Sequence, residues 1–166
     1  MSEQAVIDNL DFARNGRVMH GSVPLAELAR LQDALLSDQG VLDYTLSGKI
    51  GAKGEPLLIC SVAGKLVLQC QRCLDALEYP LQVESRLLLV QGATQFDVLD
   101  DGDEDADSIP ASAEMDVLAL VEDEVLLSLP ISPLHPPELC LGKGADKVAS
   151  EKGNNPFGVL AALKVK

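Results

Sequence analysis

The feature that most constrains the fold is a repeated alternation of apolar and polar side chains. Residues 41–47 read VLDYTLS and residues 77–90 read LEYPLQVESRLLLV. This period of two is typical of strands that bury one face. Two shorter apolar runs, 57–62 and 65–69, lie between them and are joined at Ala63-Gly64, which predicts a hairpin there. The four runs predict one largely antiparallel sheet.

Two segments space their apolar residues as helices do. Pro24 to Leu36 reads PLAELARLQDALL, with a leucine every three or four positions and a proline suited to the first turn. Met115 to Leu129 repeats the spacing and stops at Pro130. A short closing helix is expected over Asn155 to Lys166, with Asn155 as its cap. The chain is therefore expected to be an α+β protein with two main helices and a short C-terminal helix.

Two polar stretches interrupt this pattern. Residues 92–113 are mostly Asp, Gly, Ser, Ala and Pro, with too few large apolar groups to offset the entropy of ordering, which predicts a long, mobile acidic loop. Residues 142–154 predict a second, polar loop. The length of 166 residues and the 47% hydrophobic content fit a single domain over 1–166.

The chain is acidic, with a formal net charge of -13, but the charge is uneven. Between Arg86 and Lys143 there is no Lys or Arg, and 12 of the 26 acids lie between residues 97 and 124. The other 14 nearly balance the 13 basic residues. Charge therefore does not predict RNA binding, which depends on basic groups. A basic protein partner would be attracted to the acidic segment, although a solvated loop that only aids solubility is equally compatible.

The sequence predicts a cytoplasmic protein. No apolar stretch approaches the roughly 20 residues that cross a bilayer, so no membrane association is expected. The first residues, MSEQAVIDNLDF, are acidic where a signal peptide would be basic and then apolar. In a reducing compartment the four cysteines are not expected to form disulfides.

The cysteines offer the strongest chemical signal. Cys70-Gln71-Arg72-Cys73 lies between two predicted strands, where a tight turn can direct both sulfurs to one point. His135 and Cys140 follow the second helix and would complete a Cys3His zinc set. Two alternatives stay open: burial in the core, which we expect for Cys60, and a redox CxxC pair, which the flanking strands do not favour.

Enzyme signatures are missing from the sequence. It has no Gly-rich phosphate loop, no nucleophile elbow and no HExxH motif. Two Tyr, three Phe and no Trp leave few platforms for stacking RNA bases. We therefore expect a protein that is not an enzyme and has no small-molecule substrate.

Three segments together resemble the YceD family. They are LVLQCQRCLDALEYPL, MDVLALVEDEVLLSLPISPLHPPELC and NPFGVLAALK, in that order over about the last two thirds of the chain. The resemblance implies a non-enzymatic role in the synthesis, processing or stability of 23S ribosomal RNA, and thus in large-subunit biogenesis. It also implies a metal, with zinc as the candidate, at Cys70, Cys73 and Cys140, and with His135 as the fourth candidate ligand.

Our working hypothesis is an adaptor that binds a large-subunit ribosomal protein or assembly factor, with 23S rRNA as a further candidate partner. Glu122, Asp123, Glu124 and Arg72 are its candidate partner contacts, although a solvated helix face explains the three acids as well. The alternative is a zinc-containing module that acts directly on RNA. It would use Arg72, Arg86, Lys164 and Lys166.

Overall fold

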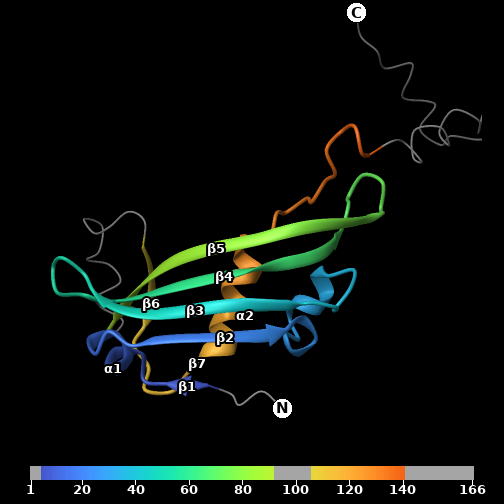
Figure 1. The fold of residues 1–166 in the computed structure, drawn as a ribbon. Coiled ribbons are helices and arrows are strands. Elements are labelled where there is room, and N and C mark those ends of the chain that lie inside the picture. Colours follow the sequence, from blue (N-terminus) through green and yellow to red (C-terminus); the bar gives the residue numbers. More distant parts are fainter. Residues whose placement is uncertain (1–4, 92–105, 141–166) are drawn as a thin grey trace, which may run out of the picture.

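The computed structural model describes residues 5–91 and 106–140. A curved five-stranded sheet has the helix α2 across one face (Figure 1). The strand order is β2-β3-β4-β5-β6; the first four strands are antiparallel and β6 runs parallel to β5. A two-stranded ribbon joins β1 to β7. The strands are β1 (Val6–Ile7), β2 (Val18–Pro24), β3 (Val41–Ile50), β4 (Pro56–Gln69), β5 (Ala76–Val90), β6 (Asp107–Pro110) and β7 (Met115–Asp116).

The expected α+β class and largely antiparallel sheet are confirmed, but the predicted hairpin at Ala63-Gly64 is wrong. β4 runs unbroken through both residues, and Gly64 pairs with Leu42 on one side and Leu81 on the other. A Cβ atom at Gly64 would lie 2.4 Å from Leu42 Cδ2. This glycine therefore makes room for a neighbouring side chain, and the sheet turns at residues 51–55 and 70–75 instead.

The second predicted helix is confirmed as α2 (Val117–Ser128). Asp116 caps its first turn by accepting hydrogen bonds from the backbone N–H groups of Leu118 (2.9 Å) and Ala119 (3.2 Å). Val117, Val121 and Val125 are fully buried against the sheet. Within the described ranges, no helix is long and apolar enough to span a membrane.

The helix predicted for Pro24 to Leu36 is wrong, although its leucines are buried as the spacing indicated. Two short 3-10 turns replace it, η1 (Leu25–Glu27) and η2 (Leu31–Ala34). Gln32 Nε2 donates to the carbonyls of Leu25 (2.6 Å) and Leu28 (2.9 Å). In a continuous helix these carbonyls would bond to backbone N–H groups four residues on, so side-chain bonds substitute for helical ones.

Sequence reasoning missed α1 (Asn9–Arg14), β2 and β6. α1 packs so closely on β3 that a Cβ atom at Gly48 would lie 2.4 Å from the Phe12 carbonyl oxygen and 2.6 Å from Ala13 Cα. β6 lies inside the stretch predicted as the acidic loop 92–113. These residues form a strand because they pair with the edge of β5. Residues 92–105 of that loop, the 142–154 loop and the closing helix over Asn155 to Lys166 lie outside the described residues.

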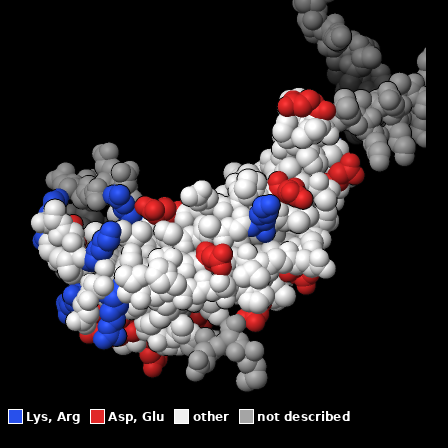
Figure 2. All heavy atoms as spheres, viewed as in Figure 1, with Lys and Arg blue, Asp and Glu red and all other residues white. Residues whose placement is uncertain are grey.

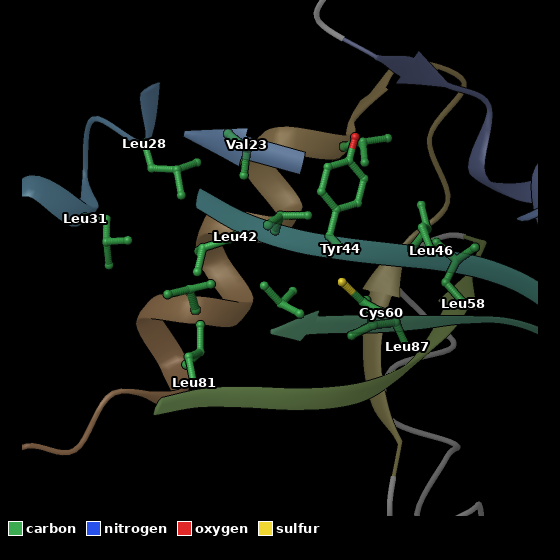
Figure 3. Packing of buried hydrophobic residues seen from close by; sticks show 14 of the residues in the cluster. Val23, Leu28, Leu31, Leu42, Tyr44, Leu46, Leu58, Cys60, Leu81 and Leu87 are labelled. Atoms are coloured by element: carbon green, nitrogen blue, oxygen red, sulfur yellow. The ribbon is translucent and has the colours of Figure 1, made fainter. Parts of the chain in front are cut away.

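The core lies between the sheet and α2 (Figure 3). Cys60 is fully buried there, as predicted. Burial, and then the nearby Glu124 charge, raises the pKa of the Cys60 thiol to about 12. This cysteine is therefore a protonated residue of the hydrophobic core.

Candidate functional site

The first half of the site is the turn between β4 and β5. The Leu74 N–H donates to the Cys70 carbonyl (2.9 Å), and the Cys70 N–H donates to the Asp75 carbonyl (3.0 Å). Leu74 adopts a left-handed φ of 64°, unusual for a leucine, which lets the chain reverse directly after Cys73. The turn places both thiols of the Cys-Gln-Arg-Cys motif on one side of the hairpin end.

The second half is the segment after α2, which runs beside this turn (Figure 1). The Gln71 N–H donates to the Pro133 carbonyl (2.9 Å), and the His135 N–H donates to Cys70 Sγ (3.4 Å). A further turn, in which the Cys140 N–H donates to the Pro136 carbonyl (3.1 Å), returns the chain to the same point. Backbone hydrogen bonds thus hold the segment against the hairpin.

The structure brings all four predicted ligands together. One ligand atom from each of Cys70, Cys73, His135 and Cys140 lies within 4.8 Å of the other three. The Cys70 and Cys140 sulfurs are 3.8 Å apart, and Cys73 Sγ is 3.3 Å from His135 Nδ1. A tetrahedron with zinc bond lengths has edges of about 3.8 Å between two sulfurs and about 3.6 Å between sulfur and nitrogen. The four residues are therefore spaced to hold one metal ion.

The surroundings prepare His135 for the role of ligand. Its Nε2 lies 3.0 Å from the Ala76 carbonyl oxygen. A proton on Nε2 donated to that carbonyl leaves the Nδ1 lone pair free to face Cys73. Metal-binding histidines generally use their second nitrogen in this way, which fixes the tautomer and the ring orientation.

The sulfurs differ in their electrostatics. Burial acts to raise the pKa of the Cys70 thiol, but the N–H groups of Cys73, His135 and Arg72 directed at its sulfur lower it to about 5. Burial, with hydrogen bonds to Cys73 and Cys70, raises the pKa of the Cys140 thiol to about 11. Cys70 is thus the thiolate that is ready to bind a cation, and a bound cation would in turn favour the thiolate of Cys140.

The candidate partner contacts lie in two kinds of place. Glu122 and Glu124 are buried, whereas Asp123 and Arg72 are exposed. Glu122 accepts from the backbone N–H groups of Arg30 (2.7 Å) and Leu31 (3.1 Å), and Glu124 accepts a hydrogen bond from the Ser85 hydroxyl. Asp123 forms an ion pair with the Arg30 guanidinium at 2.6 Å. A contact between these residues and a partner stays a prediction.

Helical spacing alone did not point to the internal partners of these acids. Adjacent positions on a helix point apart, and a solvated helix face was the simpler interpretation of the three acids. That interpretation is wrong for Glu122 and Glu124, which are buried. The residues that bond to them are far away in sequence: Arg30 directly precedes η2, and Ser85 lies on β5. An acid on the same face of the helix as the buried Val121 and Val125 would have indicated a buried carboxylate with an internal partner.

The fold and the cluster define a class: a small α+β protein in which a hairpin turn and the segment after a helix share a Cys3His set. The chain belongs to the YceD family, whose profile, described as large ribosomal RNA subunit accumulation protein YceD, matches residues 58–164. It is 29% identical over 148 residues to the protein of that name from Haemophilus influenzae, covering 84% of this chain and 83% of the relative. No solved structure matches it significantly. The predicted family resemblance is confirmed.

Proposed function

We propose that this protein is a non-enzymatic factor that supports the accumulation of 23S ribosomal RNA during large-subunit biogenesis in the cytoplasm. Membership of the YceD family carries the proposal, since the family and the Haemophilus influenzae relative bear the name of large ribosomal RNA subunit accumulation proteins. The position of the cluster supports a structural role for it. It joins two backbone segments at the end of the sheet, the β4–β5 turn and the segment after α2.

We propose that the cluster binds one zinc ion. Three sulfurs and one imidazole nitrogen that lie within 4.8 Å of one another are a donor set that zinc takes in structural sites. Such a site is closed, because four protein ligands leave no position for a substrate. The ion would cross-link the β4–β5 turn to the segment after α2, reinforcing the hydrogen bonds from Gln71 to Pro133 and from His135 to Cys70.

In this proposal the protein acts as an adaptor for a basic ribosomal protein or assembly factor. The chain carries a net charge of -13, which attracts a basic partner at long range. Asp123 and Arg72 are exposed and available for contact, whereas Glu122 and Glu124 support the partner-facing surface from within. The adaptor would need a surface that distinguishes its partner from other basic proteins.

The test is a clean deletion of the gene with complementation. Cells lacking the protein should contain less mature 23S rRNA relative to 16S rRNA, and the wild-type gene should restore the ratio. An unchanged ratio in the deletion strain would refute the role. Affinity capture of the tagged protein from the same cells should enrich a large-subunit protein or assembly factor over an unrelated acidic control protein.

Direct action on RNA is the second candidate, because basic residues from several elements gather at one end of the molecule (Figure 2). The Gly48 N–H donates to the Arg17 carbonyl (2.8 Å), which brings the end of α1 beside Lys49 on β3. Arg86 lies on the same outer face of the sheet, two strands away. The Arg17–Gly48 bond and the strand register place Arg17, Lys49 and Arg86 at this end, Arg14 ends α1, and Lys53 lies in the turn that joins β3 to β4.

Salt dependence separates the two candidates. If the basic end binds the RNA backbone, affinity for 23S rRNA fragments should fall steeply with salt, and Lys49→Glu with Arg86→Glu should abolish it. Arg72→Glu, at the opposite end, is the control for a single charge reversal and is compared with Lys49→Glu or Arg86→Glu alone. Affinity that is absent at low salt, or equally reduced by single reversals at the two ends, would remove this candidate.

A further inference from the structure

A pocket of about 260 Å³ opens beside the cysteine cluster. Three segments form its wall: the end of η2 with the residues after it, the end of β4 with the cysteine turn, and the chain that follows α2. The volume is below the roughly 300 to 1,000 Å³ of pockets that enclose whole small molecules, so it suits a single side chain better. The apolar lining includes Leu36, Leu68, Leu129, Pro130, Ile131 and Pro133.

Large apolar side chains around this pocket are unusually exposed. Ile131 has a relative exposure of 105% and Leu36 of 48%, and both line the pocket. Six of the ten exposed large hydrophobic residues of the described chain belong to this end of the molecule. An apolar patch of this kind on a soluble protein is typical of a binding surface. The six are Leu36, Leu74, Leu127, Ile131, Leu134 and Leu139.

The charges beside the patch have one dominant sign. Asp33 lines the pocket itself. Within the three segments, residues 31–38, 69–75 and 129–140, Asp38, Asp75 and Glu138 add three more acids, and Arg72 is the one Lys or Arg. Figure 2 shows red side chains outnumbering blue ones at this end, in contrast to the basic end. Charge complementarity therefore favours a cationic partner.

We infer that this surface, the apolar end, binds a protein segment in which a leucine or similar apolar anchor is flanked by Lys or Arg. The anchor enters the pocket against Leu36 and Ile131, and the flanking cations face Asp33 and Asp38. The inference rests on the proposed adaptor function and names its binding surface and the chemistry of its partner. The cysteine cluster would set the shape of this surface, because Gln71 lines the pocket directly after Cys70.

Methyl NMR tests the inference on the full chain. The chain contains five isoleucines, so the δ1 methyl of Ile131 can be followed beside that of Ile50, which is 49% exposed at the far end of β3. The probe is a synthetic peptide, Arg-Arg-Leu-Arg-Arg. It should shift the Ile131 signal in a saturable manner and leave Ile50 in place. Peptides with Ser in place of Leu, or with Glu in place of Arg, should bind at least tenfold more weakly.

Variants locate the surface. Leu36→Asp should weaken the peptide at least tenfold as read from Ile131, whereas Ile50→Asp, an equally exposed control, should not change the affinity. Circular dichroism confirms that each variant is folded. An Ile131 signal that the peptide leaves unmoved overturns the inference. An Ile131 shift on dilution alone also overturns it, because a second copy of the chain then occupies the pocket. So does an Ile131 shift on removal of residues 155–166, because the chain's own C-terminal residues then occupy it.

Complementation separates failure of this inference from failure of the proposed function. If Ile131→Asp restores the 23S to 16S ratio as well as the wild type does, the apolar end is not the adaptor surface, and the rRNA role stands. If the deletion strain shows no rRNA defect, the rRNA role itself fails. Loss of rescue by Ile131→Asp, together with full rescue by Ile50→Asp, is the result expected.

Discussion

Replacing Glu122 by Ala should destabilise the protein far more than replacing its neighbour Asp123. The Glu122 carboxylate is 10% exposed and accepts the backbone N–H groups of Arg30 and Leu31 as well as Arg30 Nε at 2.8 Å. It therefore caps η2 from a different element. Asp123 contributes only an ion pair whose two side chains are each 52% exposed, and such pairs add little.

The magnitude follows from the hydrogen bonds that are lost. A hydrogen bond to a charged acceptor contributes about 1.5 to 3 kcal/mol, and the Leu31 N–H is left without a partner in a buried place. Water can reach the Arg30 side of the gap, so we expect a loss of about 3 kcal/mol in the free energy of unfolding for Glu122→Ala. Asp123→Ala should lose a small fraction of that.

Urea unfolding followed by circular dichroism measures the difference. With a slope of about 2 kcal/mol per molar, the midpoint of Glu122→Ala should fall by about 1.5 M, and that of Asp123→Ala should stay near the wild type. Glu122→Gln, which keeps an acceptor oxygen, should lie between them. Equal midpoints for Glu122→Ala and Asp123→Ala would refute the assignment of Glu122 to the cap of η2.

Two further predictions concern packing and the buried thiol. Gly48→Ala should lower the free energy of unfolding by several kcal/mol, because the new Cβ atom meets the α1 backbone. Gly64→Ala should lower it by about 1 to 3 kcal/mol, because the Leu42 side chain can move. Equal urea midpoints for the two variants would contradict this difference. Cys60 should resist iodoacetamide at pH 8 in the native protein and react in urea, as read by mass spectrometry, because its folded pKa is about 12. Between its ordinary pKa of about 9 and that value the unfolded chain has released the Cys60 proton and the folded chain has not, so stability should fall as pH rises through this window. Cys60→Ala should show a smaller loss between pH 8 and pH 10.5, and an equal loss would show that the thiol is not responsible.

The sequence predicts the parts of this fold in which local pattern and tertiary packing agree. Alternation located β3 and β5, and the spacing of Val121 and Val125 located α2, because each pattern describes one buried face. The segment at Leu25 to Leu31 carries the same signal, but bonds from Gln32 and Glu122 compete with the helix. The Glu122 bonds join residues 91 and 92 positions apart, so no local window contains them.

The candidate site was more predictable than the fold around it. Cysteine and histidine are informative residue types, and a turn between strands leaves few directions for Cys70 and Cys73. The apolar end was not predictable, because the exposure of Ile131 and Leu36 depends on how the Pro-rich segment lies beside the end of β4 and the cysteine turn. The domain limits and the partner contacts stay predictions.

The most direct test of the central claim is the zinc content of the protein purified without chelator. We expect about one equivalent of zinc in the wild type and in Cys60→Ser, because Cys60 is buried in the hydrophobic core and is not one of the four clustered residues. Cys73→Ser and His135→Asn should each bind zinc much more weakly, because three ligands hold the ion less tightly than four. Less than about a tenth of an equivalent in the wild type, where a structural site should be nearly full, would contradict the claim.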